Sequence, residues 1–455
     1  MKESFYNIKF QHNGLNFIYN TKNSKLITFD NYDNLFANHY SDLVSNGFLV
    51  ADDFNEFEEV VNKRSEYLSK EKDYKRFTIL PTTKCNANCS FCYENDSPRY
   101  DMSDEVVEQT INFIKQESQE KKKIRVYWFG GEPLVRRDII DKISKSLIEF
   151  SNENGISYQA SIATNLSLLD KDDIEYAIEN WHLNKIEFAF DGNKEQHNKS
   201  KDYKIKNFDA FQHNLDMIDC LLNKNIIVQI RFNITKENFN DAMLLVQEIL
   251  KKHHGNKNLL LYLGVVFKTP KNQNLTKEEL IEMRQIGNYS IEFFKLLKKY
   301  NHIQGVNGLP LTYKKNNCYA SNDDSLVIGP AGIITKCQMC PDDELNKIGD
   351  IYSGIDFSSK NYNIWCNTLY FDKCQKCKLY PMCLSGCIGQ KYIYNENTCC
   401  KEKFYLDELL KTAVDMLDED KQLIKNRVLS LKRWRIWRIQ PSAWIFAGIH
   451  QIPML

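Results

Sequence analysis

Residues 76–93 read RFTILPTTKCNANCSFCY, and they decide the interpretation of the whole chain. The apolar run 76–81 is typical of a buried strand, and the loop behind it carries Cys85, Cys89 and Cys92 with no fourth cysteine nearby. Three thiolates leave one iron of a [4Fe–4S] cluster without a protein ligand, so that a small chelating molecule can bind it. A structural zinc site normally has four ligands, so a loop with three cysteines fits zinc poorly.

Strand-like and helix-like patterns alternate over residues 76–300. Amphipathic stretches separate the strands; in 105–117, for example, Val106 and Ile111 share one side, and Ser103 offers an N-cap oxygen. Six strand–helix units in succession predict an α/β fold with a parallel sheet covered by helices. In parallel barrels the chemistry lies at the carboxyl ends of the strands, and the cysteine loop follows the first strand. The six strand-like runs are 76–81, 124–129, 156–164, 185–190, 226–232 and 259–267.

The CxxxCxxC spacing, with the aromatic Phe91 just before the third cysteine, resembles the radical S-adenosylmethionine (SAM) superfamily. The resemblance implies a partial (β/α)6 TIM-like barrel, expected here over residues 73–304. It also implies that Cys85, Cys89 and Cys92 hold a catalytic [4Fe–4S] cluster whose open iron binds SAM, with Phe91 near the adenine. In this family the reduced cluster cleaves SAM to methionine and a 5′-deoxyadenosyl radical, which abstracts a hydrogen atom from the substrate.

Gly130, Gly131 and Glu132 follow the second strand and resemble the superfamily element that contacts the amino group of SAM. Two glycines let the backbone pass close to a ligand, and a carboxylate accepts hydrogen bonds from an ammonium group. We therefore expect all three residues to bind the cofactor.

Polar residues at the next three strand ends are expected near SAM by the same resemblance: Asn165, Asp191 and Arg231. A guanidinium at the position of Arg231 suits the carboxylate of SAM, because it can donate two parallel hydrogen bonds. Asn165 and Asp191 fit almost as well as ordinary polar residues at strand ends. His197 follows Asp191, but Lys201 stands where relatives often carry Arg, so His197 is interpreted as structural.

A second cysteine array lies near the C-terminus and predicts a further domain over residues 305–405. It contains Gly332, which suits a turn between paired strands. The spacing of the array matches the seven-cysteine pattern of the SPASM domain, which implies two auxiliary [4Fe–4S] clusters. The first would be held by Cys318, Cys337 and Cys387, and the second by Cys374, Cys377, Cys383 and one of Cys399 and Cys400.

The fourth ligand of the first auxiliary cluster stays open among Cys340, Cys366, a substrate group and solvent. A zinc ribbon is the alternative use of CxxC pairs. The N-terminus lacks the apolar segment of a secretory signal, which predicts a cytoplasmic, reducing location where cysteines are metal ligands or free thiols rather than disulfides. Cys220, among apolar residues at helical spacing, is interpreted as a buried thiol.

The overall composition excludes two classes of partner. Sixty basic and sixty acidic residues cancel, so no net field favours nucleic acid. No run of about 18 apolar residues occurs, so we expect no membrane span.

The two ends of the chain differ from the barrel. Residues 1–72 combine a hairpin-like segment at 6–19, a strand-like run at 25–29 and helical patterns, an order that resembles the small winged-helix peptide-recognition domain of many peptide-modifying relatives. A cap on the barrel fits this α+β segment equally well. Residues 406–455 begin as a helix and end in a Trp- and Arg-rich tail, which either covers an apolar surface or lies at a membrane interface.

SPASM relatives act mostly on peptides, so the resemblance implies an oxidoreductase that matures a ribosomally made (RiPP) precursor peptide. The expected product is a thioether or carbon–carbon cross-link, and the expected electron source is a flavodoxin- or ferredoxin-like donor. One alternative is an anaerobic sulfatase-maturating enzyme that forms formylglycine, although Gln338 stands where that branch carries its Asp base. The non-enzyme alternative is an iron–sulfur electron-transfer protein, against which the Gly-Gly-Glu element and Arg231 argue.

Overall fold

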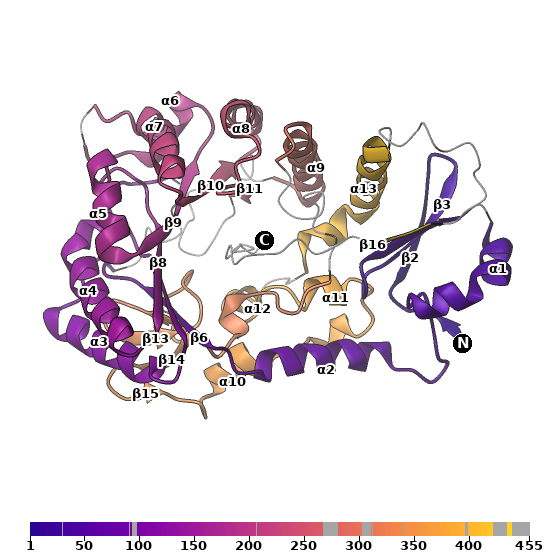
Figure 1. The fold of residues 1–455 in the computed structure, drawn as a ribbon, viewed down its shortest axis with the longest axis horizontal. Helices are drawn as coiled ribbons and strands as arrows, with labels where there is room; N and C mark the ends of the chain where they lie inside the picture. Colours follow the sequence, from indigo (N-terminus) through magenta and orange to yellow (C-terminus); the bar gives the residue numbers. More distant parts are fainter. Residues whose placement is uncertain are drawn as a thin grey trace.

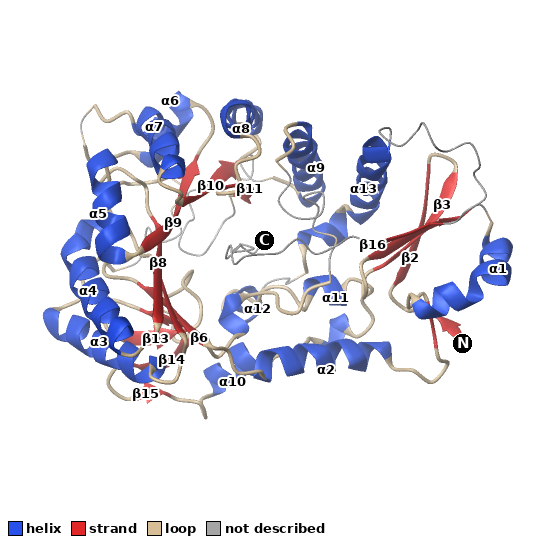
Figure 2. Ribbon diagram, viewed as in Figure 1, coloured by secondary structure: helices blue, strands red, loops and turns tan. Residues whose placement is uncertain are grey.

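The fold is taken from a computed structural model, shown in Figures 1 and 2. Phe91 and most of the C-terminal tail lie outside the residues that it describes, so the expectations for them stay predictions. The described residues are 1–29, 31–90, 92, 98–205, 207–266, 281–302, 311, 313–341, 343–395, 399–421 and 435–438.

Six parallel strands form an arc with helices on its outer side (Figure 2). The strands are β6 (Tyr74–Ile79), β7 (Lys123–Trp128), β8 (Ser157–Ala163), β9 (Leu183–Phe190), β10 (Ile227–Ile234) and β11 (Leu259–Val265), each hydrogen-bonded to the next. The helices are α3 (Asp104–Ser118), α4 (Arg137–Glu153), α5 (Lys171–Trp181), α6 (Lys194–Lys201), α7 (Ala210–Asn223), α8 (Phe239–His253) and α9 (Met283–Lys299). The predicted α/β barrel is confirmed, and all six predicted strands are present within a few residues of their expected bounds.

The arc continues beyond β6 instead of closing on β11. β12 (Ser325–Ile328) pairs with β6 in parallel, and β13 (Ile333–Thr335), β14 (Lys347–Asp350) and β15 (Gly354–Ile355) follow in antiparallel order. Gly332 turns the chain between β12 and β13 with φ +78°, as the sequence predicts. The second cysteine array is thereby joined to the first strand of the barrel, beside the strand that leads into the cysteine loop.

The alternation of side chains along the strands separates an apolar outer layer from a more polar inner wall. On β9, Ile186, Phe188 and Phe190 are buried in the core beneath the helices, whereas Glu187 and Ala189 point the other way and stay partly exposed. This two-residue period is what a sheet with one covered face requires. The inner wall is therefore the surface on which a site can form.

The N-terminal unit, residues 1–69, folds apart from the barrel around its own small sheet (Figure 1). The predicted hairpin is confirmed, because Asn13 and Gly14 adopt the positive φ values that a tight turn needs. One strand of the tail, β16, completes the sheet beside β4. The elements are β1 (Lys2–Glu3), β2 (Asn7–His12), β3 (Leu15–Asn20), β4 (Lys25–Phe29), α1 (Tyr32–Ser45), β5 (Leu49–Val50), α2 (Glu56–Ser69) and β16 (Arg435–Arg438).

The cysteine-rich segment lies between the barrel and the N-terminal unit (Figure 1). Tyr6 and Val60 of the N-terminal unit pack in one apolar cluster with Cys374, Tyr380 and Leu384. The N-terminal unit is therefore docked against the predicted ligand loops by a buried apolar contact. The helices and turns of the segment are η2 (Tyr319–Ser321), α10 (Lys360–Asn367), η3 (Asp372–Cys374), α11 (Tyr380–Cys383), α12 (Ile388–Tyr392), η4 (Lys401–Phe404) and α13 (Leu406–Lys421).

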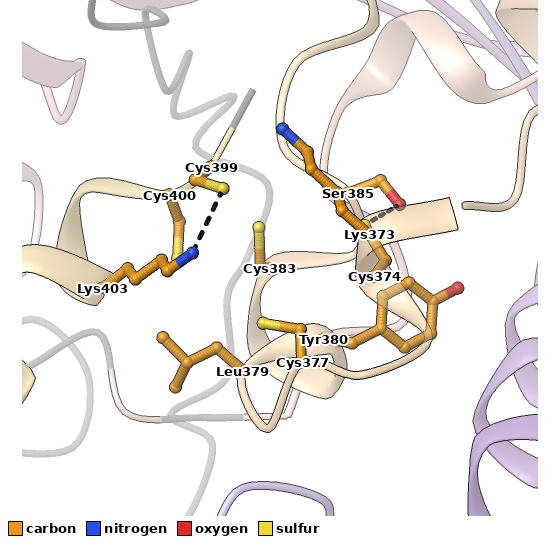
Figure 3. Close-up of a pocket in the computed structure, with 10 residues that line it drawn as sticks. All are labelled: Lys373, Cys374, Cys377, Leu379, Tyr380, Cys383, Ser385, Cys399, Cys400 and Lys403. Atoms are coloured by element: carbon orange, nitrogen blue, oxygen red, sulfur yellow. Dashed lines mark hydrogen bonds between the residues drawn. The ribbon is translucent and has the colours of Figure 1, made fainter. Parts of the chain in front are cut away.

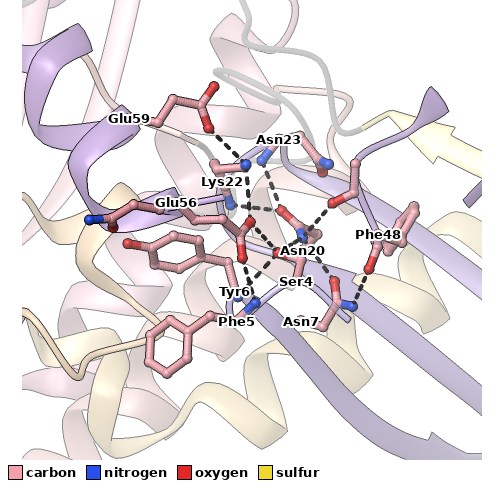
Figure 4. A network of polar contacts seen from close by, with 12 residues as sticks. Ser4, Phe5, Tyr6, Asn7, Asn20, Lys22, Asn23, Phe48, Glu56 and Glu59 are labelled. Atoms are coloured by element: carbon pink, nitrogen blue, oxygen red, sulfur yellow. Dashed lines mark hydrogen bonds and ion pairs between the residues drawn. The ribbon is translucent and has the colours of Figure 1, made fainter. Parts of the chain in front are cut away.

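A buried polar network fastens α2 to the hairpin of the N-terminal unit (Figure 4). Glu56 accepts hydrogen bonds from Ser4 Oγ at 2.7 Å and from Phe5 N at 2.7 Å. Lys22 Nζ lies 3.0 Å from the same carboxylate, whose side chain is only 4% exposed. Lys22 Nζ also lies 2.8 Å from the carboxylate of Glu59, whose side chain is 26% exposed. Without the charge of Glu56, Lys22 keeps only this more exposed partner, and the donors of Ser4 and Phe5 lose a charged acceptor.

We predict that Glu56→Gln destabilises the N-terminal unit by about 2 kcal/mol, because two donors lose a charged acceptor and Lys22 keeps only Glu59 as a counter-charge. The measurement is urea unfolding, monitored by far-UV circular dichroism. The control is Glu58→Gln on the same helix, where the side chain is exposed and the change should be within about 0.5 kcal/mol. Equal stability of the two variants would contradict the role assigned to the network.

Candidate functional site

The first cysteine loop places three thiols close together at the carboxyl end of β6. Burial, with smaller contributions from neighbouring thiols, raises the pKa of Cys85 to about 12 and that of Cys89 to about 11. Metal binding requires thiolates, so cluster assembly must release these protons. Three cysteines on one loop are a suitable donor set for a [4Fe–4S] cluster with an open iron.

The cysteines of such a cluster bind different iron atoms, so they need not converge on one point. Among the residues that the structure describes, no group of three or more His, Cys, Asp and Glu side chains is arranged to hold a single metal ion.

Gly130 and Gly131 let the loop after β7 lie directly on the cysteine loop. Gly131 N donates to Thr82 O at 3.2 Å, and Glu132 N donates to Lys84 O at 2.9 Å. A Cβ on Gly130 would overlap Thr82 O, and a Cβ on Gly131 would overlap Lys84 O and lie 2.6 Å from Thr83 O. The close approach that these glycines permit is therefore an approach of one backbone to another.

Glu132 connects the ends of the second and third strands. Its carboxylate accepts hydrogen bonds from Thr164 Oγ1 at 2.7 Å, Asn165 N at 2.7 Å and Leu134 N at 3.1 Å. The residue is 1% exposed, and burial raises its pKa to about 7. Asn165 in turn donates from Nδ2 to Asn86 Oδ1 at 2.9 Å, which ties this strand end to the cysteine loop.

Asp191 is buried in an ionic contact that the sequence did not indicate. Lys201 Nζ lies 3.1 Å from its carboxylate, Asn233 Nδ2 donates to it at 2.7 Å, and Ser200 Oγ donates as well. The charge of Lys201 also opposes the burial effect on the pKa of Cys89. Lys201 thus lies between Asp191 and the cysteine loop, with a positive charge where relatives often carry Arg.

His197 agrees with its structural interpretation. It is fully buried, its Nδ1 accepts from Asp191 N at 3.3 Å, and its ring lies 5.3 Å from that of Phe190. Burial lowers its pKa to about 4, so the ring is neutral near pH 7.

The last turn of α6 and the residues that follow it form backbone hydrogen bonds with the cysteine loop. Ser90 N donates to Ser200 O at 2.9 Å, and Lys204 N donates to Asn86 O at 3.0 Å. Lys204 Nζ donates to Cys85 O at 2.9 Å. Three loops, after β7, β8 and β9, therefore hold the cysteine loop in place.

Arg231 lies on β10, on the inner wall of the sheet. Its Nε is buried and has no hydrogen-bond partner among the described residues. The side chain lies against Gly264 of β11, where a Cβ would overlap the guanidinium. A buried donor without a partner fits a bound carboxylate, because leaving it unpaired is costly.

A polar cluster on the inner wall was missed by the sequence analysis. Glu187 accepts hydrogen bonds from Tyr127 Oη at 3.2 Å, from Gln229 Nε2 at 3.1 Å and from Tyr262 Oη. The guanidinium of Arg76 lies 5.5 Å from the ring of Tyr127. The one signal in the sequence for Glu187 is the alternation of apolar and polar side chains along β9, which places it on the inner wall. Its partners could not be predicted, because the sequence does not show which strands become neighbours.

Five cysteines of the second array line one pocket (Figure 3). Lys373 and Lys403 also line it, and Lys403 Nζ lies 3.8 Å from Cys399 Sγ. A hydrogen bond with Cys400 lowers the pKa of Cys383 to about 7, in spite of burial. Closely spaced thiols with lysines beside them suit an anionic cluster. The five cysteines are Cys374, Cys377, Cys383, Cys399 and Cys400.

The other three predicted ligands, Cys318, Cys337 and Cys387, also lie near one another. After burial, the largest causes of the raised pKa of Cys387 are its neighbours Cys337 and Cys318. Cys340 joins them through a hydrogen bond with Cys337. Cys366 interacts instead with Lys336 and Asp323.

Asn346 fixes the turn between Cys337 and Cys340, since its Nδ2 donates to both backbone carbonyls at 2.7 Å. Gln338, within this turn, is 1% exposed, and its backbone N donates to Tyr319 Oη at 3.1 Å. Its amide is therefore packed against the residue that follows Cys318.

Comparison with known proteins agrees with this geometry. Residues 79–258 match the family model of the Radical SAM superfamily. The chain is 23% identical over 403 residues to the radical SAM cyclopropyl synthase TigE of Paramaledivibacter caminithermalis, and the match covers 81% of each chain. It is 25% identical over 279 residues to the GTP 3′,8-cyclase of Clostridium perfringens, which covers 59% of this chain and 81% of that protein.

Among solved structures, native anSMEcpe with bound AdoMet shares the fold, with a TM-score of 0.59 and 15% identity. The match covers 78% of this chain and all of the other, 100%. The described residues contain no helix with the length and apolar character needed to cross a membrane.

We predict that Gly131→Ala removes most of the iron bound by the first cysteine loop. The added Cβ would push Thr83 and Lys84, and with them the cysteine loop, away from the loop after β7. The loss should be about four irons per chain. The measurement is iron content after anaerobic purification, together with 5′-deoxyadenosine formation. Gly329→Ala is the matched control, since its Cβ would meet nothing closer than 3.8 Å; an iron loss in both variants would contradict the prediction.

Proposed function

This chain is a radical SAM enzyme, and we propose that it matures a ribosomally made precursor peptide by installing a cross-link. In the proposed reaction the peptide would lose one hydrogen atom to a radical derived from SAM, and then one proton and one electron as the thioether or carbon–carbon bond closes. The cluster and SAM supply the radical when bound, and the protein supplies binding, orientation and exclusion of water.

The observation that carries the proposal is the pocket of five cysteines beside the N-terminal unit. Closing a new bond on a substrate radical releases one electron, and a further iron–sulfur cluster is a suitable acceptor. A second group of cysteines around Cys337 gives room for two auxiliary clusters. An enzyme that only cleaves SAM has no need of either group.

The contacts support one set of ligands for each auxiliary cluster. For the first we propose Cys340 as the fourth ligand, because it is hydrogen-bonded to Cys337 whereas Cys366 is engaged with Lys336. For the second we propose Cys400 rather than Cys399, because Cys400 contacts Cys383 and Cys399 lies beside Lys403. The proposed sets are Cys318, Cys337, Cys340 and Cys387, and Cys374, Cys377, Cys383 and Cys400.

The residues around the first loop have distinct proposed roles. Arg231 binds the carboxylate of SAM through its unpaired Nε. Asp191 and Lys201 hold the loop from beneath, since their ion pair is buried beside Cys89. Glu132 orders the ends of two strands and thereby shapes the surface on which SAM lies.

One comparison supports the kind of bond formed, and another supports a peptide as the substrate. TigE is named as a cyclopropyl synthase, and a cyclopropyl ring requires a new carbon–carbon bond, so we favour the carbon–carbon product over the thioether. AnSMEcpe, whose fold this chain shares, has also been solved with AdoMet and the Cp18Cys peptide bound. The N-terminal unit is the proposed site of peptide recognition, and a flavodoxin- or ferredoxin-like protein is the proposed electron donor.

The sulfatase-maturating alternative is less well supported by the site. A carboxylate can take up a proton at the position of Gln338, whereas a neutral amide cannot, and this amide is buried against Tyr319. The electron-transfer alternative is wrong, because the chain is an enzyme of the radical SAM superfamily.

The first test is the iron content and the SAM cleavage of the purified chain. Three [4Fe–4S] clusters predict about twelve irons, and Cys92→Ala should retain about eight and release no 5′-deoxyadenosine. Cys220→Ala is the control, because this thiol packs against the barrel core and should leave both quantities unchanged. About four irons in the unaltered chain would contradict the two auxiliary clusters.

The second test separates SAM cleavage from product formation. Cys377→Ala should lose about four irons, keep 5′-deoxyadenosine release and form no cross-linked peptide. The substrates tested are synthetic copies of short peptides encoded beside this chain, with mass spectrometry as the readout for loss of two hydrogen atoms. Unchanged product yield in this variant would contradict the role of the second auxiliary cluster.

A further inference from the structure

A buried arginine of the N-terminal unit reaches into the cysteine-rich segment. Arg64 lies on α2 and is 1% exposed. Its Nη1 donates to Leu384 O at 2.8 Å and also to Leu369 O, and its Nη2 donates to Asn317 Oδ1 at 3.1 Å. One guanidinium thus connects three separate loops of the segment that carries both predicted auxiliary sites.

The loops that Arg64 holds are those that position the cysteines. Leu384 lies in the short link between Cys383 and Cys387, which belong to different proposed clusters. Leu384 has φ +49° and Ser385 has φ +75°, a backbone region that is unfavourable for residues with a Cβ and that needs support from its surroundings. A hydrogen bond to the carbonyl of Leu384 supplies such support.

Asn317 extends the same connection to the other proposed cluster. It directly precedes Cys318, and its Nδ2 donates to Gly386 O while its Oδ1 accepts from Arg64. Arg64 therefore fixes the link between the two proposed clusters and the approach to the first of them.

None of the groups that accept the described hydrogen bonds of Arg64 carries a full negative charge. The described hydrogen bonds of Arg64 go to carbonyl and amide oxygens and to the phenol of Tyr380, and its Nε is buried without a partner among the described residues. Guanidinium stays protonated in proteins. The groups that favour its charge are Tyr380 first and then the thiols of Cys383 and Cys374, so an anionic thiolate cluster at these cysteines would supply the missing negative charge.

We propose that Arg64 is a positioning residue for the auxiliary sites, and that its positive charge raises the reduction potential of the cluster at Cys374, Cys377 and Cys383. The inference rests on the proposed function, since it requires that auxiliary clusters bind. Reduction adds negative charge to the cluster, so a buried cation nearby favours the reduced form. The N-terminal unit thus contributes directly to the redox centre.

The experiment is a redox titration of the full-length, anaerobically purified protein, followed by electron paramagnetic resonance and accompanied by iron analysis. Arg64→Met removes the charge and keeps most of the volume, and Arg64→Lys keeps the charge but loses the three-way fork. Lys63→Met is the matched control, because it removes one cation from the same helix at an exposed position.

We expect Arg64→Met to shift the midpoint of one auxiliary cluster to a more negative potential, with the midpoint of the SAM-binding cluster unchanged. The midpoint potential of Arg64→Lys should lie between those of the Met variant and the unaltered protein. The midpoint potential of Lys63→Met should equal that of the unaltered protein. Loss of auxiliary iron in Arg64→Met but not in Arg64→Lys also supports the proposal.

Unchanged midpoints in an iron-replete Arg64→Met protein would overturn the proposal, as would an equal shift of the midpoint in the Met and Lys variants, because the Lys variant keeps the charge. The failure of the proposed function is distinguishable, because the unaltered protein would then contain only about four irons and show no auxiliary signal to titrate.

Discussion

The rest of the site depends on holding an irregular loop rigid at the carboxyl edge of a parallel sheet. The described residues of the loop between Cys85 and Cys92 form no helix or strand, so their backbone groups need partners elsewhere. Neighbouring parallel strands end at the same edge, which brings the following loops within hydrogen-bond distance. The loops after β7, β8 and β9 each bond to the cysteine loop, through Glu132 N, Asn165 and Ser200 O among others.

The same constraint explains residue choices that a ligand alone does not. Gly131 has to be small because Thr83 and Lys84 lie against it, whatever is bound above. Glu132 has to be a carboxylate because three donors from two strand ends converge on it. A motif that is associated with a cofactor can therefore owe part of its sequence to the packing of the loop that binds this cofactor.

The sequence predicted what depends on local pattern. Six strand-like runs with helices between them predicted the barrel strands within a few residues, and the cysteine spacing singled out the five cysteines that line one pocket. Spacing alone did not separate Cys340 from Cys366, because both follow Cys337 and only the Asn346 turn brings Cys340 back to it. The fold could be predicted where the hydrophobic period of each segment and the order of the segments along the chain were enough to define it.

The roles that were missed depend on partners that the local sequence does not show. Lys201, at the end of α6, pairs with Asp191, and Glu187 meets tyrosines from β7 and β11. Arg64 contacts Leu384, which lies 320 residues further along the chain. Each is a charged side chain that is at least partly buried on folding, and nothing in its local sequence distinguishes it from a surface charge. Their partners are fixed only when the sheet order and the docking of the N-terminal unit are known.

This docking changes how peptide recognition and redox chemistry relate in the proposed enzyme. Tyr6 and Val60 cover the loop that carries Cys374, and Arg64 enters the same region, so removing residues 1–70 would expose the second cysteine group as well as remove the proposed recognition surface. A loss of activity in such a truncation would not identify its cause. A peptide that binds the N-terminal unit would bind a unit that already contacts the proposed auxiliary site. Peptide recognition and electron transfer would therefore depend on the same packed interface.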